Sequence, residues 1–156
     1  MINLMYVVLM AMLALNVSTE VLDGFSIVEE SLQRTTANST KENRSIYDDF
    51  EAQMKSNPEK VRAWFEKASE VKNMSDSLYN FVQQLKVAIV KEADGNKGDI
   101  NNIKRKDDLE AASQVMLAPG TGKGKMLFDM INSFRNRILG MVADGHQKDI
   151  IKSNQI

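Results

Sequence analysis

The chain has 156 residues, enough for one modest domain, and a formal net charge of −1, which gives no field that would attract nucleic acid. It contains no cysteine and a single histidine, so disulfides, thiolate or multi-histidine metal sites and cysteine nucleophiles are excluded. Two prolines, eight glycines and sparse aromatic residues are typical of long helices. We therefore predict an all-α protein without a cofactor.

The first seventeen residues, MINLMYVVLMAMLALNV, form an almost uninterrupted apolar run. As a helix this run would rise about 25 Å, slightly less than the roughly 30 Å hydrocarbon core of a bilayer. Adding Ser18 and Thr19, or residues preceding Met1, closes the difference. We therefore predict a transmembrane helix over residues 1–19. Two alternatives stay open: a cleaved signal peptide, although no basic region precedes the run, and a buried core helix.

The charges that follow the run set the expected orientation. No Lys or Arg occurs before Arg34, and a flank poor in basic residues tolerates translocation across the membrane. We therefore expect a cytoplasmic N-terminus, with residues 20–156 forming a helical domain on the outer side. The basic flank expected on the cytoplasmic side would then precede Met1, so we expect the native chain to begin upstream.

Helical geometry divides the predicted span into two sides. One stripe carries small residues that would allow a second helix to approach closely and dimerise; its members are Leu4, Val7, Ala11, Ala14 and Ser18. Three polar residues, Asn3, Tyr6 and Asn16, interrupt the apolar run, and lipid solvates them poorly. We expect them to contact a protein partner. The alternative places Tyr6 and Asn16 at the two membrane interfaces.

An apolar three-and-four spacing continues beyond the span, from Val21 to Leu32, without a proline or turn cluster. It predicts that the membrane helix runs on as one helix into the next region, with Gly24 as a tolerated weak point. The polar stretch 35–43 has no periodicity. Whether it interrupts the helix stays open at this level.

Asn57 and Pro58 predict the start of a further helix, with Asn57 as its cap and Pro58 at its first position. The apolar stripe that follows is about 30 residues long and ends at Gly95, so this helix must pack on others. A short helix around 107–116 and a third periodic pattern over 125–142 complete the expected helical bundle.

The sequence offers candidate chemical motifs, but none is complete. The stretch APGTGKGKM is similar to a phosphate-binding loop, yet neither Lys123 nor Lys125 precedes a Ser or Thr, and no strand is expected before it. Adjacent carboxylates such as Asp48 and Asp49 diverge by about 100° on a helix and cannot converge as an acid and base pair. We therefore predict a protein that is not an enzyme.

The opening MINLMYVVLMAMLALNVSTEVLDGF resembles the start of the GldM/PorM proteins. The stretches NPEKVRAWFEKA, DSLYNFVQQLKVAI, IKRKDDLEAASQVML and GKGK extend this resemblance over most of the chain. It implies a single-pass protein of the bacterial inner membrane whose C-terminal part is a periplasmic helical bundle, followed by β-rich domains that are absent here. It also implies a homodimer whose two membrane helices, in contact with lipid, stand inside a ring of five GldL/PorL-like multi-span subunits.

The function implied by the resemblance is that of the central shaft of a proton-driven rotary motor. Such a motor would couple the proton-motive force to type IX secretion and gliding motility, reaching outer periplasmic secretion components. Tyr6 matches a membrane tyrosine implicated in motor function, whereas the family's basic membrane residue would lie before Met1. The alternative is a passive, membrane-anchored periplasmic scaffold that links inner-membrane and outer-membrane secretion components.

Overall fold

The computed structural model describes residues 2–15, 18–142 and 145. The helices of this part, in chain order, are α1 (Ile2–Leu15), α2 (Thr19–Ser56), α3 (Pro58–Asp94), α4 (Leu109–Leu117) and α5 (Gly124–Met141). Within the same residues there is no β-strand, only an isolated bridge between Asp99 and Asn102. The prediction of an all-α protein is confirmed for the described chain.

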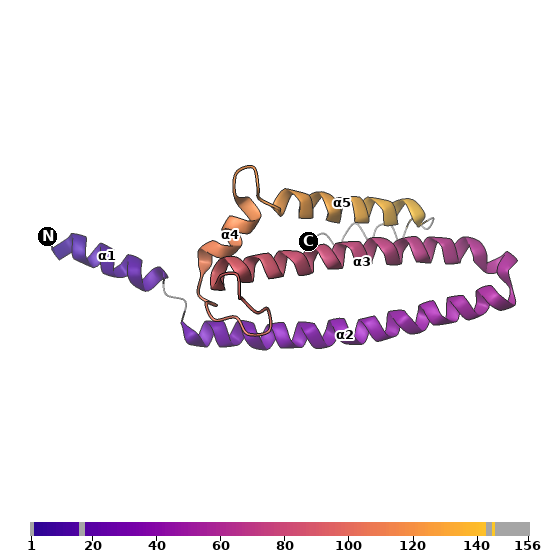
Figure 1. Cartoon of the computed structure of the whole chain (residues 1–156), viewed down its shortest axis with the longest axis horizontal. Coiled ribbons are helices and arrows are strands. Elements are labelled where there is room, and N and C mark those ends of the chain that lie inside the picture. The colour runs from indigo at the N-terminus through magenta and orange to yellow at the C-terminus, as the bar shows by residue number, and fades with distance from the viewer. Residues whose placement is uncertain (1, 16–17, 143–144, 146–156) are drawn as a thin grey trace.

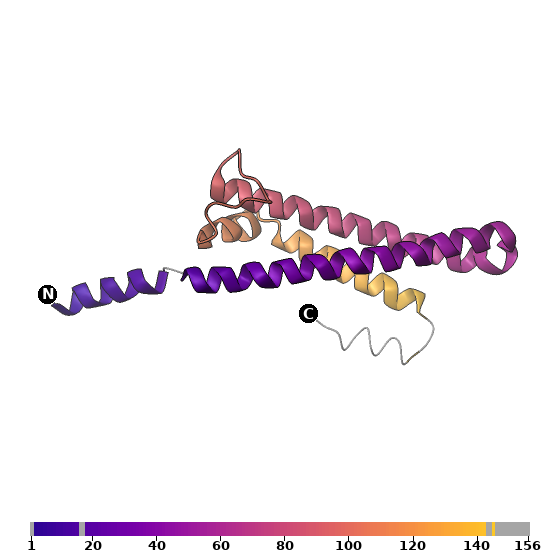
Figure 2. The same cartoon turned by 90° about the horizontal axis from the view of Figure 1, so that it is seen from below.

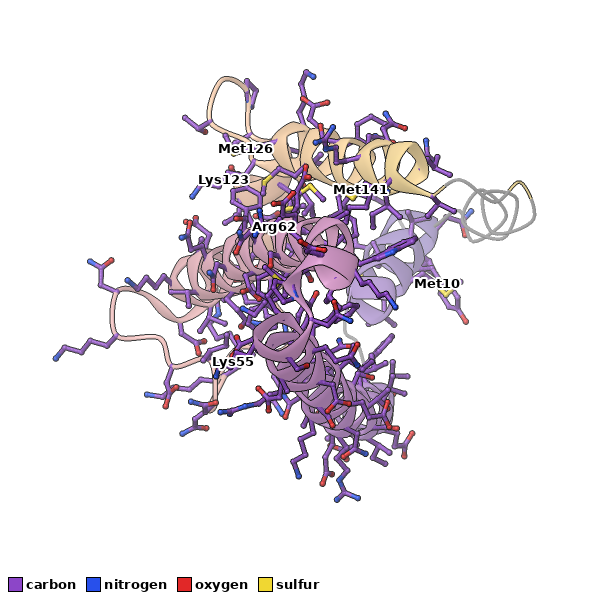
Figure 3. The ribbon with its side chains drawn as sticks, turned by 90° about the vertical axis from the view of Figure 1, so that its right-hand side faces the viewer. Met10, Lys55, Arg62, Lys123, Met126 and Met141 are labelled. Carbon is purple, nitrogen blue, oxygen red and sulfur yellow. The ribbon has the colours of Figure 1, made fainter. Side chains whose placement is uncertain are left out.

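The helices form an elongated, open array rather than a closed bundle (Figure 1). α2 and α3 make a long antiparallel hairpin, α5 lies along α3, and α4 crosses the end of α3. Seen along the helices, α2 and α5 lie on opposite sides of α3 (Figure 3), and these two described helices do not contact each other. We call the end of the hairpin where α2 begins and α3 ends the base, and the opposite end the tip.

The helix predicted to continue from the apolar run is interrupted between α1 and α2. Ser18 has an extended backbone (φ −65°, ψ 148°), and its Oγ accepts a hydrogen bond from the backbone N–H of Val21 at 3.3 Å. A hydroxyl in this position satisfies one of the N–H groups that every helix start leaves without a partner. The prediction of a single helix was therefore wrong, because Ser18 begins a new helix instead of continuing the first.

The polar stretch 35–43 does not interrupt α2. The hydroxyls of Thr35, Thr36 and Thr40 donate to backbone carbonyls four residues earlier, over 2.8–3.0 Å, so they find partners inside the helix. All side chains over residues 27–46 are exposed. The middle of α2 is thus a helix without tertiary packing, held by contacts nearer the base and the tip.

The tip is a one-residue connection. Pro58 occupies the first turn of α3, as predicted, but the side chain of Asn57 makes no capping hydrogen bond. Asn57 instead ends α2, because its backbone N–H donates to the carbonyl of Gln53 at 2.8 Å. The cap prediction was wrong because one residue serves both helices and its conformation suits the end of α2.

Near the tip, a polar contact ties α2 to α3. The hydroxyl of Tyr47 donates to the backbone carbonyl of Ala68 at 3.1 Å, and partial burial raises the pKa of Tyr47. On the other side of α3, Arg137 of α5 donates to the carboxylate of Glu70, which raises the pKa of Arg137. These two contacts join α3 to the helices on both sides of it.

The buried core is small and lies at the base. Among the described residues, the buried hydrophobic side chains are Leu85, Val90, Ala93 and Ala111, which are 4%, 5%, 6% and 3% exposed. The first three come from the last third of α3 and the fourth from α4, which packs across it. α3 ends at Asp94 and is followed, as predicted, by Gly95, whose φ of 80° is a left-handed conformation that favours glycine.

Candidate functional site on the N-terminal helix

α1 is the helix on which the sequence placed the functional residues. It projects beyond the base and contacts none of the other described helices (Figures 1 and 2). It has no acidic residue in its first turn and no basic residue in its last, and the side chains of residues 2–11 are all exposed. A helix that is apolar on every side requires an apolar environment supplied by lipid or by another protein.

Where the sequence predicted a transmembrane helix over residues 1–19, the structure has a helix of 14 residues. In the described part of the chain, no helix combines the length and the apolar character that a bilayer crossing needs. The predicted domain boundary after Thr19 falls beside Ser18, the residue that caps α2.

The predicted contact residues are only partly brought together. Asn3 and Tyr6 lie on α1, and Tyr6 is 67% exposed. Asn3 is one turn from both Tyr6 and Val7, so this polar pair borders the small-residue stripe. Asn16 lies outside the described residues.

The described residues include only part of the predicted small-residue stripe. Leu4, Val7 and Ala11 share an exposed side of α1. The side chain of Ala14 lies outside the described part. Ser18 does not belong to the stripe, because it caps α2 beyond the end of α1.

The exposed groups of α1 determine what the helix can do. The phenol of Tyr6 and the amide of Asn3 can donate and accept hydrogen bonds, and in an apolar surrounding each needs a partner. The sequence carries no acidic or basic residue before Glu20. The polar groups that α1 offers for recognition are therefore the uncharged side chains of Asn3 and Tyr6.

The glycine-rich stretch near α5 forms a tight turn. The backbone N–H of Gly122 donates to the carbonyl of Ala118 at 2.7 Å, and that of Lys123 donates to Val115 at 3.0 Å. These N–H groups are therefore engaged within the chain rather than directed toward a phosphate. Within the described residues, no group of three or more His, Cys, Asp or Glu side chains could hold a metal ion.

Sequence reasoning missed a second polar arrangement, at the base. Both carboxylate oxygens of Asp94 accept backbone hydrogen bonds, from Lys104 and Arg105, at 2.8 Å each. These bonds, with that from Lys104 the larger contribution, hold the pKa of Asp94 below its usual value. The partners are ten and eleven residues away in a segment without periodicity, so only the Asp-Gly pair that ends α3 could have hinted at a turn here.

An exposed apolar stripe of α2 adjoins this base. Its members follow the three-and-four spacing seen in the sequence, and none of the other described helices covers them. They are Val21, Phe25, Val28 and Leu32, which are 49%, 68%, 54% and 61% exposed. Apolar side chains gathered on one helix face usually contact another chain. Exposed apolar side chains are therefore found both on α1 and on the first half of α2.

The comparisons with known proteins agree with the resemblance noted in the sequence. A family model described as the GldM N-terminal domain matches residues 20–155. No curated protein sequence matches the chain. Because the matched segment is far more than half of the 156 residues, the chain belongs to the GldM family.

Proposed function

We propose that this protein is the central-shaft subunit of a rotary motor in the inner membrane, which couples the proton-motive force to type IX secretion and gliding motility. Membership of the GldM family supports the role in gliding motility and type IX secretion. The observation that carries the shaft proposal is α1, an uncharged and predominantly apolar helix that carries Asn3 and Tyr6 and contacts none of the other described helices.

The charge distribution supports a membrane position for residues 1–19. A charged side chain at the centre of a membrane helix costs about 2.5–3.5 kcal/mol on insertion scales, and the first charged residue is Glu20. The first basic residue is Arg34, which favours a cytoplasmic N-terminus and a periplasmic location for residues 20–156. The shaft would then pass from the bilayer into α2 at Ser18.

The partners in the membrane are a second copy of this chain and a ring of five GldL/PorL-like subunits. Val7 and Ala11 give the sister helix a surface for close approach, while Asn3 and Tyr6 require hydrogen-bond partners on the ring. Moving one proton through 100 mV releases about 2.3 kcal/mol, and rotation must capture it through contacts that differ between two states. Five subunits around two helices cannot make identical contacts at once, which favours stepwise rotation.

Outside the membrane, the exposed stripe of α2 supports the homodimer. The exposed apolar residues follow one another at steps of four, three and four along α2, in the order Val21, Phe25, Val28 and Leu32. This spacing is the one that brings parallel helices together. Two copies anchored in one membrane leave it in the same direction and are concentrated by their anchors. The tip, at the far end from α1, would point toward outer periplasmic secretion components.

A passive membrane-anchored scaffold is the competing function. It would require only that residues 1–19 be apolar, so any apolar helix could replace them. The presence of a phenol and an amide on an otherwise apolar surface favours the shaft, because lipid alone gives these groups no hydrogen-bond partner.

Replacing Tyr6 with phenylalanine separates the two functions. The substitution keeps the ring and removes only the hydroxyl, so we expect unchanged expression and dimerisation. Loss of one hydrogen bond made at membrane depth during rotation should reduce secretion and gliding speed by about tenfold. Secretion assays and single-cell tracking measure the effect, with Tyr79→Phe as a matched control because Tyr79 is a 54% exposed tyrosine of α3.

Normal gliding and secretion by the Tyr6→Phe strain would remove Tyr6 from the mechanism and favour the scaffold. Native mass analysis after purification in mild detergent tests the assembly itself. A complex with two copies of this chain and five multi-span subunits is expected. Isolation of the wild-type chain alone, without a membrane partner, would contradict the shaft.

A further inference from the structure

The position of the packed residues restricts how a twisting force could pass from α2 to the rest of the domain. The side chains of residues 27–46 are exposed, so the middle of α2 does not pack against α3. Force entering at Thr19 can therefore reach α3 either at the base or at the tip. The tip is about 57 Å away along a 38-residue helix, whereas the base lies beside the first turns of α2.

At the base, Asp94 holds a loop in place. Asp94 is the last residue of α3, and Gly95 reverses the chain with its φ of 80°. The loop then returns so that the N–H groups of Lys104 and Arg105 each donate to one oxygen of the Asp94 carboxylate, at 2.8 Å. A carboxylate that accepts two backbone hydrogen bonds makes a charge-assisted contact stronger than one between neutral groups.

Arg105 extends this contact to α4. Its Nη1 donates to the backbone carbonyl of Ala93 at 3.1 Å, and its Nη2 lies 2.8 Å from the carboxylate of Asp108. Asp108 in turn caps α4 by accepting from the N–H groups of Glu110 and Ala111, at 3.0 Å each. One connected set of hydrogen bonds thus joins the end of α3 to the beginning of α4.

The same loop also reaches α2. The Nζ of Lys106 donates to the Oγ of Ser26 at 3.3 Å, two turns above the start of α2. This exposed contact is weak by itself. It depends on the position of the loop, which the carboxylate of Asp94 sets through the two residues immediately before Lys106. The buried residues of the base join α3 to α4, and the loop adds a contact from this pair to α2.

We propose that Asp94 is a positioning residue for torque transfer. By fixing the loop over residues 95–108, it locks the beginning of α2 and α4 to the end of α3. Rotation delivered by the membrane helix then turns the whole domain instead of twisting α2 alone. This inference rests on the proposed shaft function. It assigns to the carboxylate of Asp94 the connection between the membrane helix and the rest of the domain.

The test is Asp94→Asn in the full-length protein. An amide has one acceptor oxygen, and its NH₂ group would face an N–H donor, so the two hydrogen bonds cannot both persist. We expect the amides of Lys104 and Arg105 to exchange with deuterium roughly tenfold faster. Gliding speed and secretion should fall severalfold, while dimerisation and co-purification with the ring stay unchanged.

Asp76→Asn is the matched control, because it removes a carboxylate of the same helix whose ion-pair partner among the described residues is Lys72, one turn away. It should alter neither exchange in the loop nor motility. Three results would overturn the proposal: unchanged exchange in the loop of Asp94→Asn, faster exchange with normal motility, or loss of folding and assembly, which would make the role of Asp94 merely structural. Failure of the shaft itself would appear separately, as a wild-type chain without ring subunits.

Acid titration supplies an independent readout of the same contact. The folded-state pKa of Asp94 is lowered, so its contribution to stability is present above the usual value of 3.8 and is lost only as the pH falls through the lowered value. We therefore expect the Lys104 amide to stay protected at pH 3.8, after correction for intrinsic exchange. Loss of protection at higher pH would contradict an ionised clamp.

Discussion

Replacing Leu85 with alanine is expected to lower the free energy of unfolding by about 2–4 kcal/mol. Leu85 is 4% exposed and belongs to the small cluster of buried side chains at the base. Its truncation removes apolar contacts and leaves a cavity that α3 and α4 cannot fill without moving. Because domains of this size are stable by only about 5–15 kcal/mol in total, the loss would be a large fraction.

Urea unfolding of the full chain in detergent, followed by far-ultraviolet circular dichroism, measures this loss. Val87→Ala is the matched control, since Val87 lies on the same helix but is 39% exposed. Its truncation should cost less than about 1 kcal/mol, because much of the side chain is already in contact with water. Equal effects at the two positions would contradict a core concentrated at the base.

Gly122→Ala is expected to destabilise the protein by about 1–3 kcal/mol, although it adds a single methyl group. A Cβ at this position would lie 2.7 Å and 2.8 Å from the carbonyl oxygens of Met116 and Ala118, and 2.9 Å from the nitrogen of Ala118. All three atoms belong to the backbone, so no side chain can move aside. The turn that positions α5 on α4 would have to open.

The same substitution in α5 should have the opposite effect. A Cβ on Gly140 meets no atom within 4 Å in the described structure, and alanine favours the helix over glycine by about 0.8–1.0 kcal/mol. Thermal unfolding of the two variants gives the comparison directly. Stabilisation by both would show that backbone crowding at Gly122 is not the reason the turn needs glycine, and destabilisation by both would contradict the prediction for Gly140.

The glycine-rich turn also shows what a motif alone cannot settle. The sequence showed that APGTGKGKM departs from a phosphate-binding loop, but not why its glycines are needed. In the structure, Gly122 is needed for close approach to the end of α4, and Gly120 has a φ of 79°. Both requirements come from the path of the chain between two helices.

The candidate site was predicted only in part. The apolar run was enough to predict a helix that carries Asn3 and Tyr6, because a long stretch of apolar residues without proline or glycine favours a helix. The same reasoning failed at Ser18, since a serine between two apolar segments can continue a helix or cap a new one, and the spacing on either side is the same. The contact of Asp94 with Lys104 was beyond prediction, because a loop without periodicity carries no signal of where it returns.

The sequence by itself determined the helical class, the start of α3 at Pro58 and its end at Gly95, because apolar spacing and backbone restrictions act over a few neighbouring residues. Only the tertiary structure decided that α3 lies between α2 and α5, that the core gathers at the base, and that the stripe beginning at Val21 stays exposed. Apolar periodicity predicts which face of a helix is apolar, but it does not predict which other helix packs against that face. Which helix covers an apolar face depends on contacts between residues that are distant in the chain. The arrangement of helices with the lowest total free energy decides it.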